Sequence, residues 1–218
     1  MKIMIHTCPK RLWYVQGYLL PCLNEQGIDG VMIWNDKYGH GNMMSCIESF
    51  QSIGGRSGGT WHLQDDIIIS ENFRELTEKN DEGIVCGFVN DRCGVNAAAT
   101  GKAPVCFLWY SFPCIRIPNH IAKEFANWYM QDARFRPEWY PRVASRKYDD
   151  WFFWEFLKER HGTEWVTHLV PNVVDHVDYL LGGSTITGNR PNKVGAAYFE
   201  DHGEEERLKQ WLSRRKAR

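Results

Sequence analysis

Apolar residues along this chain form two kinds of pattern, short continuous runs and longer stretches with helical spacing. The short runs, which are typical of buried strands, fall at residues 2–7, 29–36, 60–70 and 83–89. The stretches with helical spacing lie between them, at residues 11–26, 41–53 and 71–80. Pro21 is expected to kink or end the first helix. This β-α-β-α-β-α-β order predicts an α/β fold, with a parallel or mixed sheet flanked by helices.

The second half of the chain is less regular. Strands are expected in "APVCFLWYS" and "CIRIP", and helices at 120–133 and 149–162. A short strand and a Pro-led loop are expected at 163–177, a loop at 182–193, and a polar helix or frayed tail at 205–218. No repeat or low-complexity linker divides the chain, so we expect a single domain over residues 1–204 followed by a basic helix or tail.

Charge and composition limit the function. The net charge is −1, so no field of the whole molecule attracts nucleic acid or a membrane, and local patches must be considered separately. No apolar run approaches the length of a membrane span, and "IMIHT" after Met1-Lys2 is too short for a signal peptide. We therefore expect a cytoplasmic protein that does not contact membranes. Ten Trp favour a stacking site for a ligand or nucleic acid.

Two adjacent carboxylates stand out in "HLQDDIIIS", where Asp65 and Asp66 directly precede an apolar run. Charged residues are rarely buried without a partner, and hard divalent cations prefer oxygen ligands. Ligands of open α/β sheets bind beyond the carboxyl ends of the strands, and the Asp pair lies at a junction between two short strands. The pair therefore indicates a cation site, whereas the alternative is a solvated turn.

A second group of polar residues follows in "PNVVDHVDYLLGGS". His176, close to Asp175 and Asp178, is a candidate metal ligand because neutral imidazole suits Mn²⁺ as well as zinc. Ser184, together with the preceding glycine amides, is a candidate for holding phosphate oxygens. The alternative is a hydrogen-bonded His–Asp pair with a structural role.

Asp149 and Asp150 form a third candidate group, in "KYDDWFFWEF" at the start of a predicted helix. One carboxylate there suits the N-cap or first turn, where the helix dipole stabilises it. The other is a candidate general base that removes a proton from an acceptor hydroxyl.

A basic and aromatic segment covers residues 134–147. Its cations are Arg134, Arg136, Arg142, Arg146 and Lys147, interleaved with Phe135, Trp139 and Tyr140. Phosphate pairing plus base stacking needs this combination, so the segment is a candidate contact for nucleic acid. The alternative is a solvated loop whose arginines cover apolar surface.

In their order along the chain, these segments resemble the small GT-A glycosyltransferases. The matching pieces are "IMIHTCPKR", "WND", "TWHLQDDIIIS", "YDDWFFWEFL", "VPNVVDHV" and "GGSTI", and the resemblance covers roughly residues 2–188. It is greatest to the compact phage-type and lipopolysaccharide-type members. It implies a GT-A-like, Rossmann-type mixed sheet, with a donor-binding half at about 1–100 and an acceptor half at about 101–190.

The resemblance also implies roles for single residues. It makes Asp66 and His176 ligands of Mn²⁺ or Mg²⁺, and it places Asp65 near the ribose or sugar of the donor. It assigns Thr7, Arg11 and Asp36 to the nucleotide, Arg56 and Ser184 to the phosphates, and Asp150 with Asp149 to proton removal. The chain departs from the family's plain DxD pattern because it has Gln64-Asp65-Asp66, so which Asp touches the metal stays open.

The function implied is a metal-dependent glycosyltransferase that uses a nucleotide-diphosphate sugar, with a UDP-sugar the expected donor. The expected acceptor is the hydroxyl of a 5-hydroxymethyl pyrimidine in phage DNA, reached through segment 134–147, with inversion at the anomeric carbon. Two alternatives remain: a glycan or lipopolysaccharide-type acceptor, and a non-catalytic nucleic-acid-binding module. A nuclease or phosphohydrolase would need a second ligand cluster close in sequence, which is not seen.

Overall fold

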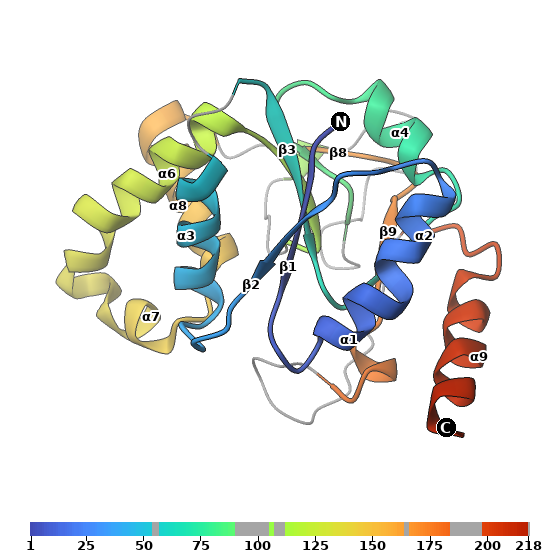
Figure 1. Cartoon of the computed structure of the whole chain (residues 1–218). Helices are drawn as coiled ribbons and strands as arrows, with labels where there is room; N and C mark the ends of the chain where they lie inside the picture. The colour runs from blue at the N-terminus through green and yellow to red at the C-terminus, as the bar shows by residue number, and fades with distance from the viewer. Residues whose placement is uncertain (54–56, 90–104, 107–111, 164–165, 184–197, 218) are drawn as a thin grey trace.

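The computed structural model describes residues 1–53, 57–89, 105–106, 112–163, 166–183 and 198–217 (Figure 1). Seven strands of the described chain form one mixed sheet in the order β2-β1-β3-β7-β5-β8-β6. Their bounds are β1 Ile3–Thr7, β2 Met32–Asn35, β3 Gly59–Gln64, β5 Val85–Cys86, β6 Val105–Cys106, β7 Cys114–Pro118 and β8 Val166–His168. A separate antiparallel pair joins β4 Ile67–Ile69 to β9 Val174–His176. The predicted α/β class with a mixed sheet is confirmed.

Strands β1, β2 and β3 run parallel, so their carboxyl ends meet at one edge of the sheet. Beyond β3 the directions are mixed. Strand β7 is antiparallel to both β3 and β5, β8 is parallel to β5, and β6 is antiparallel to β8. The parallel trio comes from the regular β-α-β first half, in which a helix returns the chain to the same end of the sheet.

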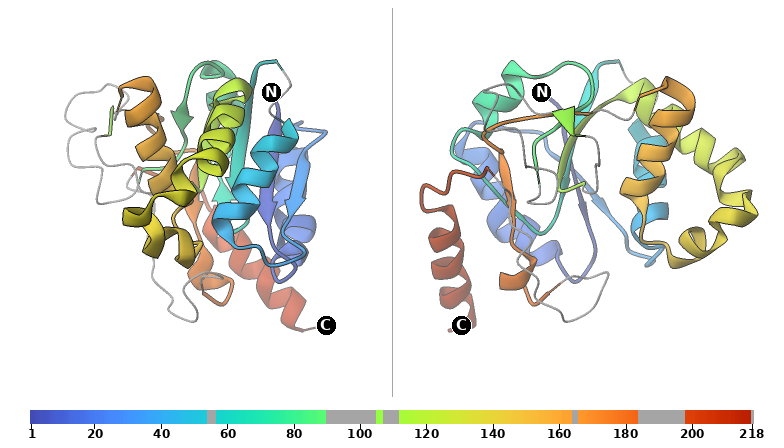
Figure 2. Two further views of the ribbon diagram at one scale, coloured as in Figure 1. Left: turned by 90° about the vertical axis from the view of Figure 1, so that its left-hand side faces the viewer. Right: turned by 180° about the vertical axis from the view of Figure 1, so that it is seen from behind.

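Helices flank the sheet in two groups on opposite sides, and the views in Figure 2 agree with Figure 1 in this. One group contains α3 Asn42–Ile53, α6 Asn119–Gln131, α7 Tyr140–Ser145 and α8 Asp149–His161, with 3₁₀ turns at Ala133–Phe135 and Pro137–Trp139. The other contains α1 Leu12–Tyr14, a π-helical turn at Val15–Leu19, α2 Leu20–Glu25 and α9 Glu204–Lys216. Helix α4 Phe73–Lys79 and a 3₁₀ turn at Asp178–Leu180 are the other elements within the described residues.

Strand β2 differs from its prediction. The run at 29–36 was expected to be buried, but β2 is an edge strand and Ile33 is 36% exposed. A continuous apolar run predicts a strand but does not show which strands have a neighbour on only one side.

The helix at 11–26 does not end at Pro21. The π-helical turn Val15–Leu19 precedes the proline, and the chain stays helical to Glu25. A proline in a helix lacks the amide donor and crowds the carbonyl four residues earlier, and the wider π turn relieves both problems.

Helix α9 belongs to the packed structure and is not a frayed tail. Leu208 is fully buried, and the indole of Trp211 stacks on Trp13 with 5.6 Å between ring centroids and an interplanar angle of 1°. Trp211 also covers Gly17, where a Cβ would lie 2.9 Å from Cζ2 of the indole. Its aromatic contacts therefore dock the C-terminal helix onto the helix that follows β1 (Figure 1).

The buried apolar side chains form one contiguous core that includes members from β1, β3, α6, α8 and α9. One core argues for one folding unit. The proposed halves at 1–100 and 101–190 stay a prediction. Among the described helices, none combines the length and the apolar character needed to cross a bilayer.

Candidate functional site

A cleft of about 690 Å³ opens beyond the carboxyl ends of β1, β2 and β3. Its walls come from the residues that follow each strand, with Thr7–Lys10 after β1, Asp36–Gly39 after β2 and Asp65–Asp66 after β3. This is the edge where open α/β sheets bind ligands, and the volume suits a small organic molecule or nucleotide. Both aspartates of the predicted cation site therefore border a real cavity.

Asp65 and Asp66 occupy the bend between β3 and β4, the junction that the sequence predicts. Asp65 is 8% exposed, and its Oδ2 accepts a hydrogen bond from the Cys8 backbone amide at 3.3 Å. Burial, and then the neighbouring Asp66 carboxylate, raise the pKa of Asp65 to about 7. The Asp65 carboxyl is thus held against the turn after β1.

Asp66 pairs with His176. The distance from His176 Nε2 to Asp66 Oδ2 is 3.2 Å, and His176 Nδ1 lies 3.6 Å from Oδ1 of Asp178. Burial alone would raise the pKa of Asp66, but the His176 imidazolium outweighs it and lowers the value. Burial likewise opposes charge on His176, yet the Asp66 carboxylate prevails and raises the pKa of His176 to about 9.

Arg11 lies beneath this group. It is 2% exposed, donates a hydrogen bond from Nη2 to the Gly183 carbonyl, and acts electrostatically on Asp65 and Asp66. It is not among the residues that line the cleft. Its position suits a counter-charge to the acidic pair better than a direct contact with a nucleotide.

The acidic pair fits a divalent cation that takes only part of its ligands from the protein. Asp66 Oδ1 is buried and has no hydrogen-bond partner in the part of the chain that the structure describes. Over the same residues, no group of three or more His, Cys, Asp and Glu is arranged to hold a metal ion alone. Mg²⁺-type sites commonly use one or two carboxylates and take their remaining ligands from substrate phosphates and water. The residues present fit a cation that arrives with a phosphorylated ligand.

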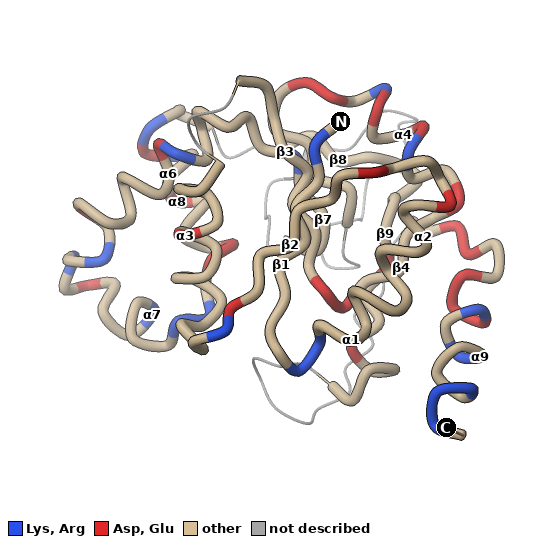
Figure 3. The backbone as a smooth tube through the Cα atoms, in the orientation of Figure 1, with Lys and Arg blue, Asp and Glu red and all other residues tan. Residues whose placement is uncertain are grey.

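The rim of the cleft is basic. The exposed side chains of Lys10, Lys37, Arg146 and Lys147 line it, and none forms an ion pair with a described residue. Figure 3 shows basic positions on the turn after β1, at the end of β2 and at the end of α7. Cations that have no acidic partner among the described residues, placed around an acidic floor, match a ligand that carries several negative charges.

Arg146 holds an unusual backbone conformation at this rim. Its φ is 55°, in the left-handed region that non-glycine residues rarely adopt, and its carbonyl accepts a bond from the Met43 amide at 3.3 Å. Gly41, with φ of 85°, lies against it, because a Cβ there would be 3.1 Å from Arg146 Cβ. The end of α7 is thereby fixed against the start of α3.

The remaining residues predicted to contact the donor lie in different places. Thr7 and Asp36 line the cleft, and both Asp36 oxygens accept bonds from the His40 and Gly41 amides at 2.9 and 3.0 Å, so their contact with a nucleotide stays a prediction. Asp36 therefore shapes the loop that carries Tyr38, an exposed aromatic ring on the cleft wall. Arg56 and Ser184 lie outside the described residues.

Asp149 and Asp150 begin α8 as predicted, and they face different surroundings. Asp149 is 5% exposed and borders a small chamber of about 20 Å³, room for about one water. Asp150 is half-buried, and its Oδ1 accepts a bond from the Trp151 amide at 2.7 Å. Burial raises the pKa of Asp150 to about 6. Neither carboxyl is among the residues that line the cleft.

The chamber and the cleft share His6, Asn42 and Gln64. His6 Nε2 lies 2.8 Å from His62 Nδ1, and burial lowers the pKa of His6 to about 4. Burial, and then His6, also lower the pKa of His62, so both rings are neutral at neutral pH. The sequence analysis missed these two histidines, although their positions on the parallel strands β1 and β3 were a usable signal.

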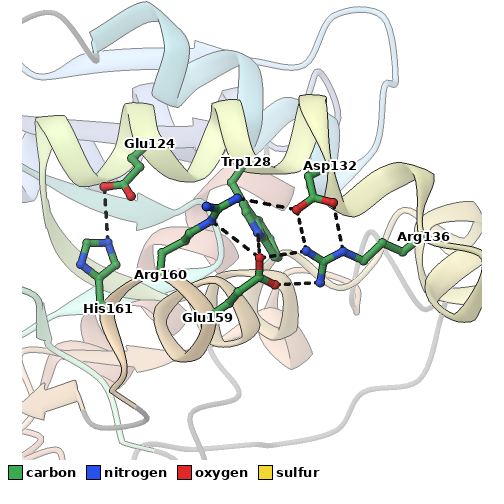
Figure 4. A network of polar contacts seen from close by, with 7 residues as sticks. All are labelled: Glu124, Trp128, Asp132, Arg136, Glu159, Arg160 and His161. Atoms are coloured by element: carbon green, nitrogen blue, oxygen red, sulfur yellow. Dashed lines mark hydrogen bonds and ion pairs between the residues drawn. The ribbon is translucent and has the colours of Figure 1, made fainter.

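Segment 134–147 divides between structural and accessible residues. Arg136 pairs with Asp132 and Glu159 at 2.6 and 2.7 Å, so that α6 and α8 are clamped together (Figure 4). Its guanidinium also lies over the Trp139 ring, 4.4 Å from the centroid. Arg146 and Lys147 at the other end are exposed and line the cleft, and the nucleic-acid contact of the segment stays a prediction.

Comparison with known proteins gives little further information. No protein family matches this chain, and no curated protein matches it. Among solved structures, the crystal structure of A197 from STIV matches with a TM-score of 0.42 and 14% identity. The match covers 93% of this chain and 96% of that one.

Proposed function

We propose that this protein is a glycosyltransferase that takes a sugar from a nucleoside-diphosphate donor and uses a divalent cation. The observation that carries the proposal is the cleft itself, in which Asp65 and Asp66 form an acidic floor beneath free basic side chains. A diphosphate-linked nucleotide needs that combination, since cations meet its charge and carboxylates hold the ion that accompanies it. The place of the cleft at the carboxyl ends of three parallel strands agrees with this ligand class.

Mn²⁺ or Mg²⁺ held by Asp66 and Asp65 would stabilise the negative charge that develops on the leaving nucleoside diphosphate. The protein's own rim contributes in the same direction. Lys10 and Lys37 follow adjacent strands and approach the same cavity, so they can pair with the phosphate oxygens. The Tyr38 ring, on the same loop as Lys37, offers a flat apolar surface beside them.

The acceptor hydroxyl must lose a proton as its oxygen bonds to the anomeric carbon and the bond to the diphosphate breaks. We assign proton removal to the carboxyl pair at the start of α8, and to Asp150 as its more exposed member. With a pKa of about 6, Asp150 is mostly ionised at neutral pH and is a stronger base than an ordinary aspartate, so it can accept the proton of the acceptor hydroxyl. Arg146 and Lys147, only a few residues earlier, already line the cleft.

For the acceptor we propose a hydroxymethyl pyrimidine of DNA. Arg146 and Lys147 belong both to the basic segment and to the cleft wall, so a strand held by that segment would pass the donor site. Exposed Phe135 and Tyr140, 64% and 68% accessible, provide stacking surfaces farther along it.

The experiment incubates the protein with Mn²⁺ and a panel of UDP-sugars, and it follows donor hydrolysis and thermal shift. DNA that contains 5-hydroxymethylcytosine or 5-hydroxymethyluracil is then added, and the nucleosides are weighed. We expect one donor to respond only with metal, and the modified nucleoside to gain one sugar. No response to any nucleotide sugar contradicts the enzyme class. A mass gain on free glycans alone contradicts only the DNA acceptor.

A further inference from the structure

His176 is held on both sides by carboxylates, which leaves neither ring nitrogen turned to the cleft. Nε2 faces Asp66 at 3.2 Å and Nδ1 faces Asp178 at 3.6 Å. Nε2 donates to Asp66 and so has no lone pair for a cation, whereas Nδ1 faces Asp178 Oδ1 at an ion-pair distance that is too long for a hydrogen bond. Turning the ring over would place Cε1 against Asp66 and Cδ2 against Asp178, so the observed orientation is the one that sets a nitrogen against each carboxylate.

The backbone around His176 fixes this arrangement. In the β4–β9 ladder His176 lies opposite Ile67, the residue that follows Asp66, and the Val177 amide donates to the Asp66 carbonyl at 2.8 Å. The Asp178 carbonyl accepts the Gly183 amide at 2.8 Å, and Arg11 binds the Gly183 carbonyl. Backbone hydrogen bonds therefore fix the main chain at or beside each of the three residues of the Asp66–His176–Asp178 group.

Seen from the cleft, the His176 imidazole lies behind Asp66. The side chains of Asp66, His176 and Asp178 are 13%, 18% and 6% exposed, and Asp66 alone of the three lines the cleft. With Oδ2 engaged by His176, the oxygen of Asp66 that remains without a partner among the described residues is Oδ1.

We propose that His176 is a positioning residue for Asp66 and not a metal ligand. The imidazole holds Asp66 Oδ2 from behind and presents Oδ1 to the cation, while Asp178 fixes the ring. This role rests on the proposed function only for the identity of the cation. It implies that the protein supplies the metal with carboxylate oxygens alone and leaves the other positions to phosphates and water.

The first test is pulsed electron paramagnetic resonance of Mn²⁺ added to the protein with UDP, because a directly bound imidazole nitrogen gives a distinct ¹⁴N modulation. We expect no such signal from the wild-type protein. A ¹⁴N signal that disappears in His176→Gln overturns the proposal, because it identifies His176 as a ligand. Complete failure to bind Mn²⁺ counts against the proposed function, and the inference is then decided by the second test.

The second test needs no metal and uses side-chain ¹⁵N NMR of the histidines in the metal-free protein. Asp66→Ala should move the His176 resonances and leave His161 unchanged, since His161 pairs with Glu124 on the far helices. Unmoved His176 resonances overturn the proposal.

A matched pair of variants separates positioning from ligation by affinity. His176→Ala should weaken Mn²⁺ binding about 10–100-fold, as loss of an outer partner of a metal ligand commonly does. In His176→Gln the side-chain amide can still donate to Asp66, so most of the affinity should return, and His161→Ala should change nothing. Equal losses in the Gln and Ala variants contradict positioning.

Discussion

Arg11 and Gly183, 172 positions apart in the chain, are joined by a buried hydrogen bond from the Arg11 guanidinium to the Gly183 carbonyl. The bond ties the turn after β1 to the segment that follows β9, and it lies under the acidic floor of the cleft. Arg11 therefore links two distant segments by a hydrogen bond and is also a counter-charge for Asp65 and Asp66.

Replacement of Arg11 by Met should destabilise the protein strongly. The change removes one of the two buried cations of the acidic group, beside His176, together with the charged hydrogen bond to Gly183, and loss of a hydrogen bond of a charged group costs roughly 1.5–3 kcal/mol. Urea unfolding measures the loss. Lys10→Met, next in sequence but exposed, is the control and should stay within about 0.5 kcal/mol of wild type. Equal small effects of both changes would contradict the role given to Arg11.

The effect of Gly17→Ala on stability should reverse its sign when Trp211 is removed. In the wild-type background Gly17→Ala places a Cβ 2.9 Å from the indole and should lower stability. In a Trp211→Ala background that obstacle is gone, and the same change should stabilise by up to about 1 kcal/mol through helix propensity. Thermal unfolding of the four proteins measures both effects. The same sign in both backgrounds would contradict the docking of α9.

Asp149→Asn should stabilise the protein at high pH. Burial, and then the Asp150 carboxylate, raise the pKa of Asp149. An acid whose pKa is raised by folding binds its proton more tightly when folded, so its ionisation lowers stability as the pH rises above the unfolded value near 4.

The variant lacks this cost, and its Tm at pH 8 should exceed that of wild type by about 2–4 °C, equivalent to about 1 kcal/mol. The difference should shrink toward pH 4, where the wild-type carboxyl is protonated in the folded state and about half protonated in the unfolded chain. Tm measured from pH 4 to pH 8 checks this. A variant that is less stable than wild type at every pH would show that the ionised form is the stabilised one.

Arg146→Ala and Lys147→Ala should each reduce the salt dependence of DNA binding. Loss of one phosphate contact reduces the steepness of log K against log salt by about 0.9 on duplex DNA and about 0.7 on a single strand. Fluorescence anisotropy over a salt series measures the slope. Arg214→Ala, at the end of α9, should leave the slope unchanged. The same change in slope for all three variants would show that DNA does not bind along the cleft.

Much of the fold could be predicted from local pattern. Strand β1, helices α3, α6 and α8, and the end of α8 at Gly162, whose φ is 62°, follow from apolar spacing and end signals. The exposed edge position of β2 could not be predicted, because it depends on which strands pair. Pairing of β4 with β9, separated by more than 100 residues, was likewise missed.

In the candidate site, too, some residues could be predicted from local sequence and others only from the fold. Asp65 and Asp66 were identifiable because adjacent charges before an apolar run are chemically unusual. Lys10 and Lys37 were missed, since single exposed lysines carry no pattern until the sheet brings them to one cavity. Arg136 had the composition of a nucleic-acid contact, but its partners Asp132 and Glu159 lie on two helices that only the fold brings together (Figure 4).

The most direct measurement of the central claim is calorimetric titration of UDP into the protein, with and without Mn²⁺, for wild type and Asp66→Ala. If the aspartates hold a cation that accompanies a diphosphate, wild type will bind UDP at least tenfold more tightly with Mn²⁺, and Asp66→Ala will lose that difference. UDP affinity that is independent of Mn²⁺ in wild type, or equally dependent in the folded variant, would contradict the account.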